Sequence, residues 1–428
     1  MIKQYSYNEI NIVDIFSRVE EKKNKITDVV AEIIATVRQK GDIALRDYSL
    51  RFDGAVLEEM EVLSEEIEKA YQDVDEEFIS ILEEAAEHIR GYHEKQKRSD
   101  MMYMPREGVV LGQKITPLDR VGLYVPGGTA NYPSTVLMNG IPAKIAGVKE
   151  VIMVTPAKGG KISNEVLAAA KIAGVDRIFK IGGAQAIAAL AYGTETIPRV
   201  DKIVGPGNAF VAEAKKQVFG KVAIDMIAGP SEILVIADGQ ADGAVVAADM
   251  LSQAEHDEMA SAVLITDSKE LAEAVSVCLE QQIPLLPRKD IARKSIDDSG
   301  KIILAKSIEE SIEIANQIAP EHLELCVDNP FDYLGQIRHA GSIFLGKNAP
   351  EALGDYFSGT NHTLPTGGSA RFASPLSVDD FIKKSSFTYY TKDALAKEAE
   401  KINTFAKREG LTAHGKSVMI RFEKEAEE

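Results

Sequence analysis

The sequence predicts an α/β fold built from two parallel-sheet units. From about residue 108 onward, short apolar runs rich in β-branched residues alternate with helical patterns. Strand–helix–strand repetition of this kind is typical of parallel sheets joined by right-handed crossovers. The chain also has 428 residues, which is more than one ordinary core accommodates. Two or three domains are therefore expected.

Seven apolar runs are the predicted strands: 151–155, 177–181, 201–204, 233–237, 262–266, 302–305 and 342–345. The helical patterns between them span 164–173, 184–192, 209–219, 241–253, 269–280 and 308–318. Residues 1 to about 105 differ, because apolar residues recur there at helical spacing, as in 27–37. His88 and His93 lie in this part among charged residues, which favours an exposed helix face for both.

Four segments are expected from this pattern. Residues 1–20 form an N-terminal extension, 21–123 join 232–376 in a first, discontinuous α/β domain, 124–231 form a second, and 377–428 form a helical extension. A break at Ala228–Ser231 separates the two sheet units. Ligands of open α/β sheets bind beyond the carboxyl ends of the strands, so we expect the substrate there, in the crevice between the units.

Charge and composition exclude several classes of partner. The formal net charge is −17, whereas nucleic-acid binders and proteins of anionic membrane surfaces carry basic patches. No apolar stretch is long enough to span a membrane, and the first residues lack the apolar core of a signal peptide. The two cysteines, Cys278 and Cys326, exclude a disulfide framework and favour the cytoplasm. Both lie in apolar periodic segments and are expected to pack rather than react.

Histidine is scarce and grouped. Five of the seven histidines follow residue 255, and four of these lie in short polar segments. Gln253 and His256 are three residues apart at the end of a predicted helix, so they share a face, and Asp355 and His414 lie in similarly polar loops. Two imidazoles, a carboxylate and an amide oxygen suit zinc with positions open for substrate. Hydrogen-bonded loop residues remain the alternative, because spacing alone does not bring the four together.

Glu321 and His322 form a second polar group, which directly precedes a further predicted strand at 323–327. A carboxylate beside an imidazole is a plausible acid–base pair near neutral pH, and a helix-to-strand corner is the alternative. Glycine loops at 125–129, 181–185 and 204–208 follow strands and open helices, which suits a phosphate or a plain tight turn equally. The dinucleotide fingerprint GxGxxG does not occur.

Taken together, the segments resemble histidinol dehydrogenases from about residue 25 to 422. The resemblance rests on VGLYVPGGTANYPSTVLM, KIGGAQAIAALAYGT, VGPGNAFVAEAK, DMIAGPSEILVIAD, LSQAEHD, APEHLEL, AGSIFLG, GDYFSGTNHTLPTGG and EGLTAHGKSV, in one order. It implies two incomplete Rossmann-like parallel-sheet domains with helical N- and C-terminal extensions. It also implies an NAD-dependent enzyme with one zinc ion per subunit that oxidises L-histidinol, through L-histidinal, to L-histidine, the last step of histidine biosynthesis.

The resemblance also implies a role for each site residue. The zinc ligands are expected to be Gln253, His256, Asp355 and His414, and the acid–base pair Glu321 and His322. The expected substrate contacts are Ser231, Gln253, His256, His322, Asp355, His362, Glu409 and His414. The expected NAD contacts are Tyr124, Gln185 and Asn208. A homodimer is implied in which the C-terminal tail supplies Glu409 and His414 to the partner's site.

Two other functions are compatible with parts of the sequence. A zinc hydrolase could use Glu321 as its base, and formation of NADH from histidinol separates it from a dehydrogenase. A non-catalytic binding protein could keep the fold, but Glu321, His322 and all four expected ligands are present, which argues against it.

Overall fold

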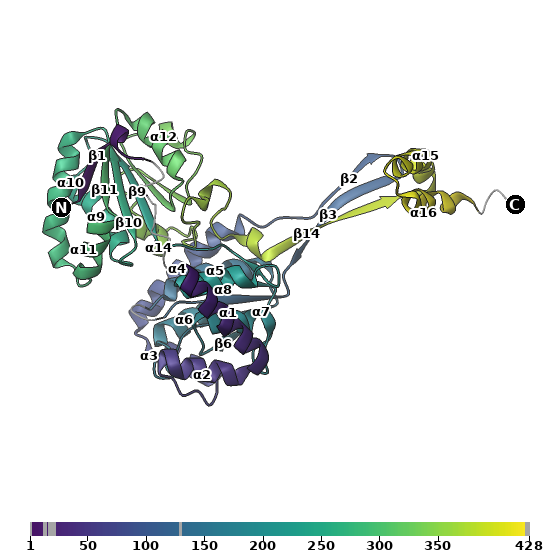
Figure 1. Cartoon of the computed structure of the whole chain (residues 1–428), viewed down its shortest axis with the longest axis horizontal. Coiled ribbons are helices and arrows are strands. Elements are labelled where there is room, and N and C mark those ends of the chain that lie inside the picture. Colours follow the sequence, from purple (N-terminus) through teal and green to yellow (C-terminus); the bar gives the residue numbers. More distant parts are fainter. Residues whose placement is uncertain (1, 12–14, 16–22, 128–130, 424–428) are drawn as a thin grey trace. The chain divides into compact units, whose positions relative to one another are not determined.

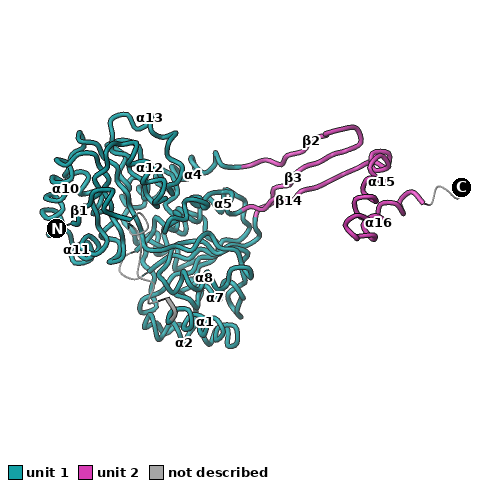
Figure 2. Tube along the Cα trace, turned by 45° about the horizontal axis from the view of Figure 1, so that its top comes forward, with its two compact units in different colours: residues 1–97, 118–381 teal, residues 98–117, 382–428 magenta. Residues whose placement is uncertain are grey.

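The computed structural model describes residues 2–11, 15, 23–127 and 131–423. It contains two compact units, which Figure 2 colours separately: residues 1–97 with 118–381, and residues 98–117 with 382–428. Among the described residues, no helix is long and apolar enough to cross a membrane. Part of the glycine loop at 125–129 lies outside the described residues.

The first unit holds two parallel sheets (Figure 1). Sheet B has the order β6-β5-β4-β7-β8. Its strands are β4 (Arg120–Tyr124), β5 (Glu150–Val154), β6 (Arg177–Phe179), β7 (Lys202–Val204) and β8 (Ala223–Ile224). Sheet A has the order β1-β11-β10-β9-β12-β13. Its strands are β1 (Lys3–Ser6), β9 (Glu232–Ala237), β10 (Ser261–Thr266), β11 (Lys301–Leu304), β12 (His322–Cys326) and β13 (Ser342–Leu345). All seven predicted strands and the further one at 323–327 are confirmed.

Both sheets repeat one topology. Numbered within each sheet, β4–β8 and β9–β13 run in the spatial order 3-2-1-4-5, and every pairing is parallel. This order is that of a Rossmann half with its connections reversing next to the first strand. The expected pair of incomplete Rossmann-like sheets is therefore confirmed, with switch points between β4 and β7 and between β9 and β12.

Helices cover both faces of sheet B. One face packs against α1 (Lys23–Lys40), α2 (Asp42–Asp53), α7 (Gly183–Tyr192) and α8 (Ala209–Val218). The other packs against α3 (Ser64–Asp73), α4 (Glu76–Glu94), α5 (Pro133–Ala146) and α6 (Asn164–Ala173). The helices between residues 23 and 94 thus pack on sheet B, whereas the expected first domain joined 21–123 to 232–376. The apolar stripe of α1, at Val30, Ile33, Ile34 and Val37, shares its core with Ile152 and Phe179 of sheet B.

Sheet A is covered in the same way. One face packs against α9 (Gly243–Ala254), α10 (Lys269–Gln282) and α11 (Lys289–Asp298), and the other against α12 (Ile308–Ile318). Short elements complete the unit: η1 (Tyr7–Glu9), η4 (Ile283–Leu285), α13 (Phe331–Leu334), α14 (Glu351–Tyr356), η5 (Ser369–Arg371) and η6 (Val378–Phe381). The expected N-terminal extension instead begins with β1, which pairs with β11 in parallel. The main chain of β11 would otherwise form an unpaired edge.

The second unit is an antiparallel sheet with two helices. Its strands β2 (Met101–Arg106), β3 (Val109–Pro117) and β14 (Ile382–Tyr390) have β3 at the centre, and α15 (Lys392–Arg408) and α16 (Thr412–Glu423) follow. The expected helical extension thus begins with a strand. Its sequence IKKSSFTYY combines β-branched and aromatic residues with charge, which suits a solvent-exposed strand.

Candidate active site

The expected acid–base pair lies at the amino ends of the strands of sheet A. His322 is the first residue of β12, Glu321 precedes it, and Ser231 directly precedes the neighbouring strand β9. We expected these side chains at the carboxyl ends of the strands, but they lie at the amino ends. The reason is local, because Pro320–His322 connects helix α12 to strand β12 and so enters the sheet at its amino edge.

Glu232, at the start of β9, holds both members of the pair. Its main-chain N–H donates to Oε2 of Glu321 over 2.8 Å, and its carbonyl oxygen lies 2.9 Å from Nδ1 of His322. A carbonyl can only accept, so Nδ1 of His322 carries a proton and donates it there. In the neutral imidazole this leaves Nε2 as the basic nitrogen.

The surroundings of His322 favour the neutral imidazole. Its side chain is buried and stacks against the ring of Phe344. Burial lowers the pKa of His322 from 6.5 to about 4, although the carboxylate of Asp355 opposes this shift. At neutral pH His322 can therefore accept a proton.

The metal-type residues gather beside His322 around an unpredicted carboxylate, that of Glu351. Ligand atoms of His256, Glu351 and Asp355 all lie within 4.8 Å of one another. Gln253, with its amide nitrogen facing Glu351, donates to Oε2 of that carboxylate over 2.9 Å. Nε2 of His322 lies 3.7 Å from Oε1 of Glu351. Gln253, His256, Asp355 and His322 thus converge, although sequence spacing did not require it.

This donor set fits a divalent metal ion. Burial and the neighbouring carboxylates of Asp355, Glu321 and Glu324 raise the pKa of Glu351 well above its usual value, so a cation bound here would relieve the repulsion between these groups. An imidazole, a carboxylate and an amide oxygen are suitable ligands for zinc. When Nε2 of Gln253 donates to Glu351, Oε1 of the same amide is available to a metal.

His362 adjoins this group. Its Nδ1 lies 3.6 Å from Oδ1 of Asp355, and its Nε2 lies 3.3 Å from Oγ1 of Thr135 on α5. Burial lowers the pKa of His362, as it does for His322. The Asp355 carboxylate therefore belongs to the metal-type group and also lies close to His362, an expected substrate contact.

Glu409 and His414 lie in the second unit. Glu409 ends α15, His414 lies in the first turn of α16, and both side chains are exposed. The main-chain N–H of His414 donates to Leu411, and its carbonyl accepts from Ser417, which fixes the local backbone. Gln253, His256 and Asp355 belong to the first unit.

The expected NAD contacts lie at the carboxyl edge of sheet B. Tyr124 ends β4, Gln185 lies in the first turn of α7, and Asn208 caps α8 by accepting from the N–H groups of Phe210 and Val211. Tyr124 is buried, which raises its pKa to about 12, and its hydroxyl oxygen accepts from the N–H of Gly183. Tyr124 is the last residue of β4, whereas Gln185 and Asn208 come after β6 and β7.

The glycine loops here have a structural cause. Gly205 has φ +112°, and a Cβ at this position would collide with the carbonyl oxygen of Tyr124. Only glycine lets the chain pass so close to the end of β4. A tight turn therefore explains Gly205 by itself.

The sequence analysis missed Glu351 and assigned His93 wrongly. Glu351 and Asp355 are four residues apart after Pro350, a helix-start signal that would have placed both on one face of a helix. His93 is completely buried, not exposed as expected. Its Nδ1 lies 2.7 Å from Gln96, and its Nε2 lies 3.4 Å from the amide of Asn361, the residue before His362.

The two cysteines differ in their burial. Both are free; Cys326 is buried at the end of β12 and Cys278 is half-buried on α10. Burial raises the pKa of the Cys326 thiol, and the nearby carboxyl groups of Glu324 and Asp249 raise it further. A thiol of this kind resists ionisation and is a poor nucleophile.

Known proteins share this sequence and fold over nearly their whole length. The model of the histidinol dehydrogenase family matches residues 16–422. A histidinol dehydrogenase of Bacillus cereus is 56% identical over 396 residues, 92% of each chain, and one of Listeria monocytogenes is 55% identical over 94% of each. A crystal structure of histidinol dehydrogenase from Elizabethkingia anophelis superposes with a TM-score of 0.93 at 40% identity, covering 99% of this chain and 98% of that one. Because the family model spans nearly the whole chain and these relatives match it over at least 92% of its length, the chain belongs to the histidinol dehydrogenase family.

Proposed function

We propose that this oxidoreductase converts L-histidinol, through L-histidinal, to L-histidine in two NAD-linked steps that depend on one zinc ion per subunit. One observation carries the proposal: the basic Nε2 of His322 lies 3.7 Å from Glu351, the carboxylate around which Gln253, His256 and Asp355 gather. The proton acceptor and the residues that suit zinc therefore lie next to each other.

Gln253, His256 and Asp355 would hold zinc, with His414 of the partner subunit as the fourth ligand. When bound, zinc supplies a Lewis acid that anchors the imidazole and amine of the substrate, and NAD supplies the hydride acceptor. Ser231 and His362 flank this place in the first unit and would contact the substrate, together with Glu409 from the tail.

His322 has the main role in the first half-reaction. Its Nε2 accepts the hydroxyl proton of histidinol as the carbinol C–H bond gives up its hydride, which leaves the aldehyde. The bond from Nδ1–H to the carbonyl of Glu232 keeps the ring in the required tautomer. The proton then passes to solvent, because His322 must be neutral again for the second oxidation.

Glu321 has the main role in the second half-reaction. Its carboxylate takes a proton from water as the water oxygen bonds to the aldehyde carbon, and the product is a hydrate. The hydrate then gives up its own hydride, and His322 takes the proton of one hydroxyl group, which leaves the carboxylic acid. No cysteine takes part, in agreement with the disfavoured thiolate of Cys326.

NAD would bind at the carboxyl edge of sheet B through Tyr124, Gln185 and Asn208. The edge lacks the glycine fingerprint that usually holds a pyrophosphate, so the cofactor would exchange readily between the two oxidations. We also propose a homodimer in which residues 377–428 reach the partner subunit, because Glu409 and His414 are exposed in their own unit.

The test is a spectrophotometric assay with metal analysis. Purified protein should form NADH when histidinol and NAD are added, a strong chelator should abolish this activity, and added Zn²⁺ should restore it. His256→Ala should lose both metal and activity, since removing one ligand opens the coordination shell. Full activity in metal-free protein would refute the zinc assignment, and absence of NADH formation from the zinc-loaded protein would refute the oxidation itself.

A further inference from the structure

Three elements of the first unit each carry two polar residues on a single face. The pairs are Asp249 with Gln253 on α9, His322 with Glu324 on β12, and Glu351 with Asp355 on α14. Spacings of four on a helix and two on a strand place both members of each pair on one side. One member of each pair belongs to the proposed site. The other three, Asp249, Glu324 and Glu351, are here named the supporting layer.

Glu351 is the member that touches the site. Its carboxylate accepts from the amide nitrogen of Gln253 and, over 3.1 Å, from the hydroxyl of Ser252. It also lies next to Nε2 of His322. An amide that donates through its nitrogen must present its oxygen on the opposite side, so this contact decides which atom of Gln253 can reach a metal.

Glu324 binds the main chain of Glu351. Its Oε1 accepts from the main-chain N–H of Glu351 over 2.6 Å, and its side chain is 1% exposed. This N–H belongs to the first residue of α14 and has no partner within the helix. Glu324 therefore anchors the start of α14, and with it the positions of both Glu351 and Asp355.

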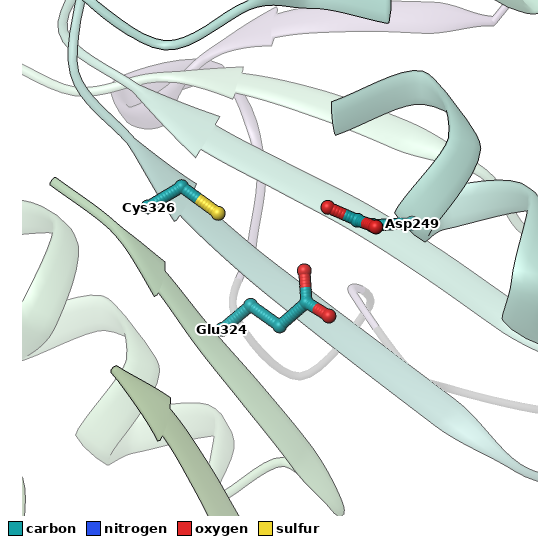
Figure 3. A group of neighbouring side chains, drawn as sticks. All are labelled: Asp249, Glu324 and Cys326. Atoms are coloured by element: carbon teal, nitrogen blue, oxygen red, sulfur yellow. The ribbon is translucent and has the colours of Figure 1, made fainter. Parts of the chain in front are cut away.

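Asp249 completes the layer. Figure 3 shows its carboxyl group and that of Glu324 close together, with the thiol of Cys326 beside them. These ligand-type atoms lie within 4.8 Å of one another, and Oε2 of Glu324 is buried without a donor among the described residues. Ionised carboxylates only accept, so the two groups can bond only if they share a proton. Burial raises the pKa of both carboxyl groups, which keeps such a proton in place near neutral pH.

We propose that Asp249, Glu324 and Glu351 are positioning residues that fix the amide of Gln253 and the carboxylate of Asp355 for zinc binding. The inference rests on the proposed function, because it names the residues that support the same site. None of the three would touch substrate. Partners of metal ligands typically change metal affinity 10- to 100-fold when removed.

The first experiment measures zinc affinity by competition with a chromophoric chelator, on folded dimer at pH 7. Glu351→Ala should bind zinc about 10- to 100-fold more weakly than the unmodified protein. Glu351→Gln should lose less, since its amide oxygen can still accept from Gln253. Cys326→Ala is the matched control, because it removes a buried group beside the layer but no member of it, and it should bind zinc as the unmodified protein does.

An exchange variant separates positioning from mere stability. In the double variant Gln253→Glu, Glu351→Gln, an amide donor again faces a carboxylate acceptor. This variant should therefore bind zinc more tightly than Glu351→Ala. Equal affinity of these two variants would overturn the proposal, as would unchanged affinity in Glu351→Ala. If Gln253→Ala keeps zinc whereas Glu351→Ala loses it, Glu351 is itself a ligand and the positioning role is wrong.

The second experiment tests the shared proton. Asp249→Asn can donate to Glu324 in place of the proton and should keep zinc affinity, whereas Asp249→Leu, of similar size, should lower it about tenfold or more. Equal affinity of the Asn and Leu variants would overturn the role of Asp249. A second metal equivalent per chain that Asp249→Asn removes would instead mark the pair as a cation site.

The unmodified protein distinguishes failure of the proposed function from failure of the supporting layer. If the unmodified protein binds no zinc, the proposed function is wrong. If it binds zinc and the variants bind zinc equally well, only the role of the supporting layer is wrong.

Discussion

Nδ1 of His322 lies 2.9 Å from the main-chain oxygen of Glu232, so the peptide group at the start of one strand sets the tautomer of an imidazole on the next. The same residue donates its main-chain N–H to Glu321. The pairing of β9 with β12 in parallel, with His322 opposite Ile233, creates both contacts. A sheet edge therefore orients two adjacent side chains, the proposed proton acceptors of the two half-reactions.

This arrangement predicts that the two half-reactions can be separated by mutation. Glu321→Gln keeps the shape of the side chain but cannot accept a proton, so histidinal oxidation should fall more than histidinol oxidation. His322→Asn can keep the bond to Glu232 but lacks the basic Nε2, so histidinol oxidation should fall by about 10²- to 10⁴-fold. Stopped-flow NADH formation from each substrate measures the two halves. Equal loss of both halves in Glu321→Gln would contradict the division of roles.

Acid should destabilise the metal-free protein through His322. Its pKa is lowered from 6.5 to about 4 by burial, so between these values the unfolded chain binds a proton that the folded chain does not. This contribution to stability is fully present above about pH 6.5 and is lost as the pH falls through about 4. Calorimetry on chelator-treated protein should show a melting temperature that falls on acidification by several degrees more than that of His322→Asn. Parallel curves for the two proteins would show that His322 is not buried in its neutral form.

The two cysteines should be dispensable for both oxidations. Cys326 is buried beside two carboxyl groups that raise the pKa of its thiol, and Cys278 is half-buried on α10. The double variant Cys278→Ser, Cys326→Ser should therefore keep at least a tenth of the activity on histidinol and on histidinal, within the loss that a core substitution causes. Steady-state assays with each substrate measure this. Selective loss of histidinal oxidation in folded protein would point to a thioester intermediate.

Mixed dimers should recover activity if the tail serves the partner subunit. His256→Ala and His414→Ala should each be inactive alone. Unfolded together and refolded, they form mixed dimers in which one site carries both changes and the other carries neither. A random mixture is then expected to regain roughly a quarter of the unmodified activity, because half of the dimers are mixed and each has one intact site. If mixed dimers form but stay inactive, the tail completes the site of its own chain.

Much of the local structure was predictable because periodicity records it directly. Residues 164–173 and 308–318 are helices with the predicted bounds, and the apolar runs of both parallel sheets are strands. Strands that depend on a distant partner were not predictable. Lys3–Ser6 has little apolar character and Met101–Arg106 contains no β-branched residue, and both are strands because β11 and β3 offer main-chain hydrogen bonds.

The candidate site was likewise only partly predictable from the sequence. His93 was expected on an exposed face because its sequence neighbours are charged, yet Gln96 and Asn361 enclose it. Glu351 gave no signal by itself, since its importance comes from contacts with Gln253, Glu324 and His322, which belong to two other elements.

The sequence alone determined the fold class, the family resemblance and the residue types available for chemistry, because apolar periodicity and polar segments are properties of the chain itself. The tertiary structure decided that Glu321 and His322 lie at the amino edge of sheet A, that α1–α4 cover sheet B, and that Glu351 joins Gln253, His256 and Asp355. These outcomes depend on which apolar faces share a core and which buried polar atoms find partners. Both are decided by contacts between segments far apart in the chain, which no local pattern records.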